Sequence, residues 1–249
     1  MSKRRNRSYA QKTEVTEVGN VNNMISFNSY AQRKKLITLI PKSVKQEEYI
    51  DLLTDPNLTI VFATGPAGTG KTMLAVMAAI RAYQADEVNK IVITRPAVGV
   101  DDEQHGFLPG NLNSKMEPWT RPIMDVMMEY YCPKDIARML DEQHIEISPL
   151  AYMRGRTFKN SWIIADEMQN ATPNQMKMLL TRIGNGSKMV VTGDTRQADR
   201  REDDNGLLDF RRLVELYQGS KYIAGVEFGS RDIHRHPAVT EVLKIYGEI

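Results

Sequence analysis

The segment that most constrains the fold of this chain is Gly65–Thr72, with the sequence GPAGTGKT. It follows an apolar run, LTIVFAT, and leads directly into KTMLAVMAAIRAY, which has the composition of a helix. A glycine-rich turn between a buried strand and a helix lets backbone N–H groups and the helix N-terminus face an anion. Because G-x-x-x-x-G-K-[ST] is matched in full and in this context, the segment predicts a site for nucleotide phosphates.

The residues of this loop have separate expected roles. Lys71 is expected to place its charge between the β- and γ-phosphates, and Thr72 to ligate Mg²⁺. A chance match in a glycine-rich turn is the alternative, and the flanking strand and helix argue against it. The residues predicted to bind the nucleotide are Gly65, Pro66, Ala67, Gly68, Thr69, Gly70, Lys71 and Thr72.

Short apolar runs recur along the chain, and most are separated by helical stretches. They show little of the alternation of a one-sided sheet, which is typical of strands buried on both faces of a parallel sheet. The expected class is therefore α/β, with a mainly parallel, helix-flanked sheet, and 249 residues fit one large domain. The expected strands are residues 58–65, 90–96, 145–150, 161–167, 188–194 and 222–229.

Two segments depart from this pattern. Residues 1–30 are polar and basic and have no sustained period, so they are expected to be a flexible arm before one domain at 31–249. Residues 97–135 are proline-rich and predict an irregular insertion with a short helix around MDVMMEYY. By contrast, TPNQMKMLLTRI predicts a well-bounded helix that begins after Thr172.

Two carboxylates follow the apolar run SWIIA. Asp166 is expected to ligate Mg²⁺ from the strand end, and Glu167 to polarise a water for attack on the γ-phosphate. For Glu167 the alternative is a solvated surface carboxylate. The tandem acid pair favours hydrolysis over phosphoryl transfer, and no acceptor pocket or lid motif supports a small-molecule kinase.

A third set of polar residues follows the run KMVVTG. Asp194 ends this run and Gln197 comes shortly after, so both are expected at the same sheet edge as the acid pair. Gln197 is a candidate sensor of the γ-phosphate. Asp194 alternatively caps a helix or stabilises a turn.

Composition excludes several classes of site. The single cysteine, Cys132, excludes an intramolecular disulfide and is interpreted as packing, and the four histidines lack metal-site spacing. No long apolar run or secretory signal is present, so a cytoplasmic protein is expected. The net charge of +2 is small, so nucleic-acid binding rests on three basic clusters, at residues 3–7, 33–35 and 154–159.

These motifs together resemble the PhoH-like family, P-loop proteins related to superfamily 1 helicases. The resemblance covers about residues 40–247 and also includes TRPAV, GFLPG, YMRGRTF, DEMQN, VVTGDTRQAD and RHPAV. It implies an ATPase with a RecA-like P-loop NTPase core that uses ATP and Mg²⁺. It further implies a link to phosphate starvation and a single-domain, phage-type form, which would work in the host cytoplasm if phage-encoded.

The resemblance assigns further residues. Gln46 falls where related helicases read adenine, although it could be an exposed helix residue. Arg235 is the candidate finger for the γ-phosphate, with Arg231 as the fallback.

Three more arginines, Arg95, Arg154 and Arg156, would line the nucleic-acid or phosphate side of the core. Each is equally a candidate for a structural ion pair. Tyr152 and Phe158 are the aromatic residues nearest this cluster.

The resemblance also bears on assembly. Superfamily 1 helicases have two RecA-like cores, whereas this chain has one phosphate loop, so a neighbouring identical subunit is expected to supply the arginine. Such heterologous contacts close into a ring, and a hexamer is favoured. The expected function is an oligomeric ATPase acting on RNA or single-stranded DNA, and the alternative is an ATP-dependent switch or scaffold that binds a protein partner.

Overall fold

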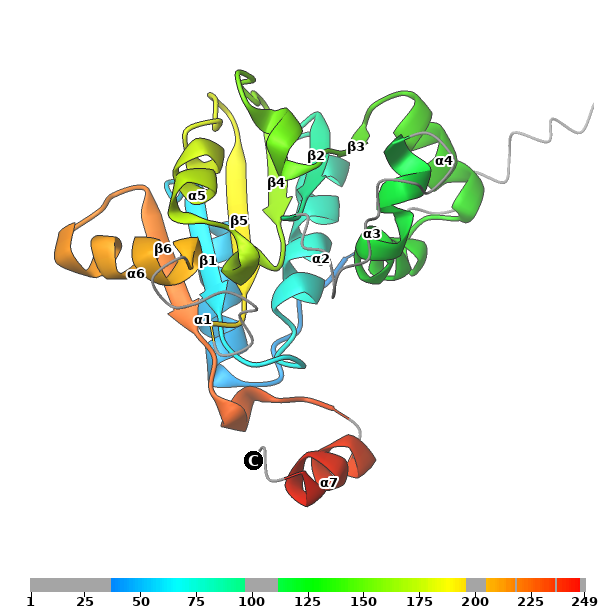
Figure 1. Cartoon of the computed structure of the whole chain (residues 1–249). Helices are drawn as coiled ribbons and strands as arrows, with labels where there is room; N and C mark the ends of the chain where they lie inside the picture. The colour runs from blue at the N-terminus through cyan, green and yellow to red at the C-terminus, as the bar shows by residue number, and fades with distance from the viewer. Residues whose placement is uncertain (1–36, 97–111, 196–204, 218, 236, 247–249) are drawn as a thin grey trace, which may run out of the picture. The chain divides into compact units, whose positions relative to one another are not determined.

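The computed structural model describes residues 37–96, 112–195, 205–217, 219–235 and 237–246 (Figure 1). The expected arm at residues 1–30 lies outside these ranges, as do Gln197 and residues 97–111 of the expected insertion. The division into an arm and one domain therefore stays a prediction.

Six strands of the described residues form one sheet, in the order β3-β2-β4-β5-β1-β6. Every neighbouring pair is parallel. This confirms the expected α/β class, and all six strands lie within the predicted runs. Their bounds are β1 (Ile60–Thr64), β2 (Lys90–Thr94), β3 (Ile145–Ile147), β4 (Ser161–Ala165), β5 (Lys188–Gly193) and β6 (Ile223–Glu227).

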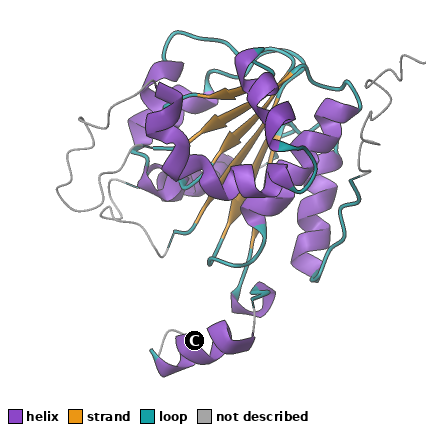
Figure 2. Ribbon diagram, turned by 90° about the vertical axis from the view of Figure 1, so that its right-hand side faces the viewer, coloured by secondary structure: helices purple, strands orange, loops and turns teal. Residues whose placement is uncertain are grey.

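Helices cover both faces of the sheet, as Figure 2 shows. Val61, Ile91 and Ile164 pack with residues of the first four helices, while Phe62, Val92 and Ile163 pack with the next two. Because successive strand residues point to opposite faces, strands β1, β2, β4 and β5 contribute to both cores. The helices are α1 (Val44–Thr54), α2 (Lys71–Gln84), α3 (Leu112–Met128), α4 (Pro133–Asp141), α5 (Pro173–Leu180), α6 (Gly206–Tyr217) and α7 (Pro237–Ile245).

Helix α3 corrects the expectation of a short helix around MDVMMEYY. It spans 17 residues and contains Pro118 and Pro122, which were interpreted as marks of irregular structure. Ile123 and Met127 lie one turn apart and are buried in the core that α2 also contributes to. Packing of this apolar face therefore outweighs the cost of proline inside a helix.

Helix α5 begins where its sequence predicts. The Thr172 hydroxyl accepts a hydrogen bond from the Gln175 backbone N–H at 3.2 Å, and the Gln175 side chain accepts from the Thr172 N–H at 2.9 Å. Pro173 occupies the first turn, where its missing N–H costs nothing. This capping box fixes the exit of the loop that carries the acid pair.

No helix of the described residues is long and apolar enough to cross a bilayer. Cys132 precedes α4 and is half-buried, and its thiol donates to Asp135 Oδ2 at 3.2 Å. The packing interpretation of this cysteine fits that position.

Lys188 joins the end of α1 to the sheet. Its ammonium donates to Leu53 O at 2.8 Å and Asp55 O at 2.6 Å, and it lies 5.6 Å from the centre of the Trp162 ring. Lys188 thereby gives a donor to the Leu53 carbonyl and a second donor to the Asp55 carbonyl, which also accepts from the Leu58 N–H at 3.3 Å. Burial lowers the pKa of Lys188 to about 8, against the opposing effect of Asp55.

We expect Lys188→Met to lower the free energy of unfolding by about 1–3 kcal/mol, because the Leu53 carbonyl loses its donor and the Asp55 carbonyl keeps only the Leu58 N–H. Between pH 8 and 10 the unfolded chain binds more protons at this lysine than the folded protein does, since the folded pKa lies below the ordinary 10.5. The stability of the wild type should therefore rise with pH relative to the variant. Denaturant unfolding of both proteins at pH 7, 8, 9 and 10 measures this, and a pH-independent difference would contradict it.

Candidate nucleotide and magnesium site

The phosphate loop leaves the carboxyl end of β1 and ends where α2 begins, at Lys71. Gly65 and Gly68 have φ angles of 132° and 84°, which disfavour other residues. A Cβ on Gly65 would lie 2.4 Å from the Phe228 carbonyl oxygen. These two glycines therefore provide both the backbone conformation and the close approach of the segment that follows β6.

Lys71 lies at the centre of this loop. Its ammonium donates to Gly65 O at 2.7 Å and to Pro66 O at 2.8 Å. Burial lowers the pKa of Lys71, and the carboxylates of Asp194, Asp166 and Glu167 act in the opposite direction. The lysine therefore sits among three carboxylates, as a group that faces bound phosphates and their metal would.

Gln46 holds the loop from α1. Its Nε2 donates to Thr69 O at 2.9 Å, and its Oε1 accepts from Lys42 N at 2.7 Å. With 2% of its surface exposed, it is not the exposed helix residue of the alternative interpretation. These contacts place Gln46 beside the phosphate loop, and adenine reading stays a prediction.

Tyr49 is a supporting residue that the sequence analysis missed. Its hydroxyl donates to Lys71 O at 3.3 Å, and the side chain is fully buried. It lies three residues after Gln46, on the same side of α1, and this helical spacing is the signal that could have found it.

Asp166 brings three elements together. Its Oδ1 accepts a hydrogen bond from the Thr72 hydroxyl at 2.8 Å and a second from the Thr192 hydroxyl. These bonds link β4 to the start of α2 and to β5. Thr192 was also missed, because a threonine near the end of an apolar strand has no marked pattern.

The residues around Asp166 fit Mg²⁺. A hydroxyl and a carboxylate provide hard oxygen ligands, and Mg²⁺ at phosphate sites takes one or two such ligands with water and phosphate oxygens. No cluster of three or more His, Cys, Asp or Glu residues that could hold a metal occurs in the described ranges. Thr72 and Asp166 would hold the ion together with the nucleotide.

Glu167 follows Asp166 in an unusual backbone conformation. Its φ and ψ are 55° and 37°, in the left-handed region that few residues other than glycine adopt. The side chain is half-buried, and its carboxylate accepts a hydrogen bond from Gln169 Nε2. Glu167 is therefore held beside the phosphate edge of the sheet rather than left as a solvated surface carboxylate.

Asp194 lies at the end of β5, as predicted, and is 6% exposed. Its backbone N–H donates to Gln169 Oε1 at 3.2 Å. The carboxylate acts on Lys71 more strongly than any other charged group. Asp194 is thus part of the charge pattern of the loop and more than a turn-stabilising residue.

Arg235 reaches the phosphate loop of its own chain. The His234 backbone N–H donates to Gly68 O at 2.9 Å, just after the 3₁₀ helix η6 (Ser230–Asp232). A Cβ on Gly68 would lie 2.4 Å from Arg235 Nε, so glycine makes room for this arginine. Arg231, the fallback, and Arg235 are both exposed, so it is the proximity to Gly68 that marks Arg235.

Two of the expected nucleic-acid arginines make internal contacts. Arg156 forms a two-point ion pair with Glu146, with Nη2 and Oε2 at 3.0 Å, and its guanidinium lies 4.5 Å from the centre of the Phe158 ring. Arg95 donates to Trp119 O at 3.2 Å. The Arg156 contact fits the ion-pair alternative, whereas the Arg95 contact is a hydrogen bond to a backbone carbonyl.

The surface near Arg156 leaves other groups accessible. Phe158 is buried, with 4% exposed, so its ring is not available to a base. Tyr152 is 61% exposed and Arg154 is also exposed. Tyr152 is therefore an accessible aromatic group of this segment, and Arg154 and Lys159 are accessible basic groups.

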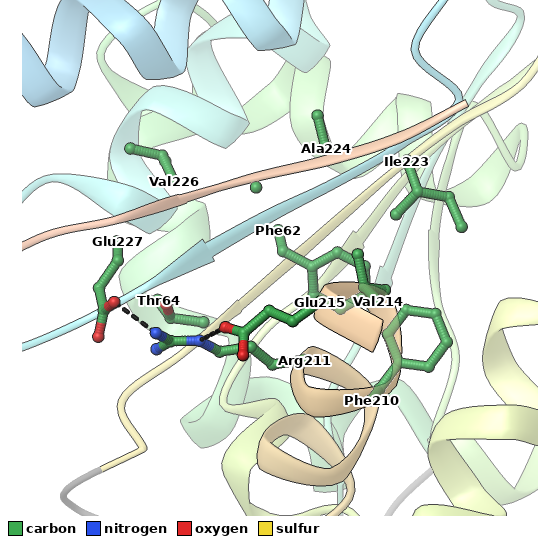
Figure 3. Close-up of a pocket in the computed structure, with 11 residues that line it drawn as sticks. Phe62, Thr64, Phe210, Arg211, Val214, Glu215, Ile223, Ala224, Val226 and Glu227 are labelled. Atoms are coloured by element: carbon green, nitrogen blue, oxygen red, sulfur yellow. Dashed lines mark hydrogen bonds and ion pairs between the residues drawn. The ribbon is translucent and has the colours of Figure 1, made fainter. Parts of the chain in front are cut away.

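A separate cavity of about 260 Å³ lies between α6 and the edge strand β6 (Figure 3). Phe62, Phe210 and Val214 line its apolar part. At one side, Arg211 donates to Glu215 at 3.1 Å and to Glu227 at 2.6 Å. The cavity lies on the sheet face that carries α5 and α6, and it is distinct from the phosphate loop.

Comparison with known proteins identifies the family. A family model described as PhoH-like protein matches residues 38–247. The chain belongs to the PhoH-like protein family. The resemblance inferred from its motifs is thereby confirmed, and this PhoH-like chain is a P-loop NTPase with a RecA-like α/β fold.

Curated PhoH-like relatives match most of the chain. The PhoH-like protein of Mycobacterium tuberculosis (strain H37Rv) is 44% identical over 209 residues, which are 84% of this chain and 58% of the relative. That of Bacillus subtilis is 42% identical, covering 82% and 63%. Protein PhoH of Escherichia coli K12 is 33% identical over 255 residues, covering 98% and 69%. The chain thus spans about three-fifths of the length of several of these relatives.

Among solved structures, the Pif1 helicase from Candida albicans aligns with a TM-score of 0.41 at 13% sequence identity. The alignment covers 83% of the PhoH-like chain and 43% of the helicase.

We expect Thr192→Val to weaken Mg²⁺ binding in the presence of ATP by about 10- to 100-fold, because Asp166 loses a hydrogen bond that orients it. Magnesium titrations of nucleotide binding measure this effect. Thr94→Val is the matched control, since Thr94 ends the neighbouring strand β2 and its buried hydroxyl has no partner among the described residues. Equal losses in both variants would contradict the role of Thr192.

Proposed function

We propose that this PhoH-like chain binds ATP with Mg²⁺ and hydrolyses it. The observation that carries the proposal is the 2.8 Å contact between Thr72 and Asp166. It joins the phosphate loop to the acid pair across 94 residues of sequence. A phosphate-binding loop and a metal-binding carboxylate in contact form the core of a phosphoryl-transfer site.

In the proposed reaction the chain positions the phosphates and a water. The loop N–H groups and Lys71 hold the β- and γ-phosphates, and Gln46 reads the adenine. Bound Mg²⁺ would neutralise charge on the β- and γ-phosphate oxygens. Glu167 accepts a proton from the water whose oxygen attacks the γ-phosphorus, and the bond to the ADP oxygen breaks. Gln197 senses the γ-phosphate.

We further propose that Arg235 stabilises the γ-phosphate charge on its own chain. This differs from the expectation that a neighbouring subunit supplies the arginine, and its support is the contact of Arg235 with Gly68. The hexameric ring was expected because a neighbouring subunit would supply this arginine, so an arginine that acts on its own chain removes that reason for a ring.

The nucleic acid on which the chain is proposed to act is RNA or single-stranded DNA. The exposed Tyr152 and Arg154 support it, because a base stacks on an aromatic ring while a cation binds the backbone phosphates. The proposed setting is the cytoplasm of a bacterium or of a phage's host, with the family's link to phosphate starvation.

An ATP-dependent switch that binds a protein partner is the second candidate. It is favoured by the exposed Leu213, Leu216 and Tyr217 on α6.

We expect Glu167→Gln to lower kcat for ATP hydrolysis by about 100- to 10,000-fold while ATP binding persists. Single-stranded RNA or DNA should stimulate the wild type, and the stimulation should fall as salt rises, because phosphate contacts release counterions. Steady-state hydrolysis with each polymer, at low and moderate salt, measures both effects. Slow turnover that is indifferent to both polymers would favour the protein-partner switch.

We expect Arg235→Ala to lower kcat about 1,000-fold, as loss of an arginine that contacts the γ-phosphate does. Mixing Arg235→Ala with Lys71→Ala tests where this arginine acts. If Arg235 serves its own loop, mixed assemblies stay inactive, because no chain carries both residues. Recovery of activity in the mixture would show that Arg235 acts across a subunit interface, and analytical ultracentrifugation would report the size of the assembly.

A further inference from the structure

Gln169 connects two parts of the site that the proposed reaction treats separately. It lies in the 3₁₀ helix η4 (Met168–Asn170), two residues after Glu167, and is 3% exposed. Its Nε2 donates to Glu167 Oε2, and its Oε1 accepts from Asp194 N at 3.2 Å. An ionised carboxylate only accepts and a backbone N–H only donates, so one amide orientation satisfies both partners.

Glu167 depends on this support. A glutamate in the left-handed region is less stable than one in an ordinary conformation, and such residues persist where their surroundings hold them. The backbone of Glu167 is held by the Asn170 N–H, which donates to Glu167 O at 3.1 Å. Gln169 is the described side chain that donates to its carboxylate.

Gly193 makes the connection to β5 feasible. A Cβ on Gly193 would lie 2.7 Å from Gln169 Oε1 and 2.6 Å from Leu207 Cδ2. Both separations are too short for real atoms, so any larger residue would displace Gln169 or Leu207. The glycine therefore lets the Gln169 amide approach the end of β5 closely enough to accept from Asp194.

The end of β5 is consequently connected to both carboxylates by hydrogen bonds. Thr192 donates directly to Asp166, and Asp194 reaches Glu167 through the Gln169 amide. Thr192 thus provides a hydroxyl to Asp166, Gly193 leaves room for the Gln169 side chain, and Asp194 provides the N–H that holds the Gln169 amide. A shift of this strand end by a few tenths of an ångström would change the support of Glu167.

We propose that Gln169 is a positioning residue that couples the end of β5 to Glu167, so that hydrolysis requires the Asp194 backbone in its described place. The inference rests on the proposed ATP hydrolysis and adds to it a route of control. Whatever moves the chain at Asp194 would withdraw the hydrogen bond that holds the Gln169 amide, and Glu167 would lose its orientation. A change confined to the Gln169 side chain would leave ATP binding unaffected, because Gln169 donates to and accepts from groups outside the phosphate loop.

Three substitutions separate the two ends of this connection. Gln169→Met keeps the approximate shape but removes the amide donor and acceptor. Gln169→Glu retains an acceptor for the Asp194 N–H, but it cannot donate to Glu167 and repels it. Gly193→Ala leaves the Gln169 side chain intact and presses on it from β5.

For all three variants we expect kcat for ATP hydrolysis to fall about 10- to 100-fold. In the two Gln169 variants, KM and ATP affinity should stay within about twofold of wild type, whereas Gly193 also accepts from the Gly65 N–H of the phosphate loop at 3.2 Å. Combining Gln169→Met with Gly193→Ala should lower kcat no further than the more severe single change, because both act through one connection. Gln175→Met is the matched control. It breaks the α5 capping box and should lower the unfolding temperature without changing kcat well below that temperature.

The outcomes are distinct. Three results would each overturn the coupling role while leaving ATP hydrolysis established. They are an unchanged kcat in Gln169→Glu, additive losses in the double variant, and a loss of ATP affinity that parallels the loss of kcat in the Gln169 variants. Loss of kcat in Gln175→Met to the same extent would show that general loosening of the loop explains the effect. Absence of hydrolysis by the wild type would overturn the proposed function and this inference with it.

Discussion

The hydrogen bonds that converge on Asp166 hold the site together. One carboxylate oxygen accepts from Thr72 at the start of α2 and from Thr192 on β5, while the backbone continues from β4. A charged acceptor buried at 7% exposure is costly unless such donors are present. The two threonines therefore stabilise the carboxylate and fix the distance between the phosphate loop and the acid pair. The positions of Lys71, Glu167 and Asp194 follow from that arrangement.

Local patterns were sufficient to predict the framework. The glycine loop, the six apolar strands and the cap of α5 each occupy a few consecutive residues, and their physical signals are contained within them. The carboxyl ends of parallel strands meet at one edge, so the convergence of Gly65, Asp166 and Asp194 also follows from the strand pattern. Helix α3 was misjudged because its stability comes from contacts of Ile123 and Met127 with distant residues rather than from its own sequence.

The supporting residues could not be predicted in the same way. Lys188 contacts carbonyls more than 130 positions away, and Thr192 contacts Asp166 across 26. A lysine or a threonine at a strand end could contact many different groups, and only the assembled sheet determines which one it contacts. Arg235 is a further case. Its motif marked it as functional, but its proximity to Gly68 depends on the course of the chain after β6.

The place of β1 in the sheet has a consequence for the order of folding. β1 lies between β5 and β6, so its backbone partners are at residues 188–193 and 223–227. Gly65 packs against the Phe228 carbonyl, and the Gly68 carbonyl accepts a hydrogen bond from the His234 N–H. Contacts of such long sequence separation form late. During synthesis the phosphate loop emerges before the segments that pack against it, which follow up to about 170 residues later, so a nascent chain becomes competent to bind a nucleotide only once the segment around His234 has been translated.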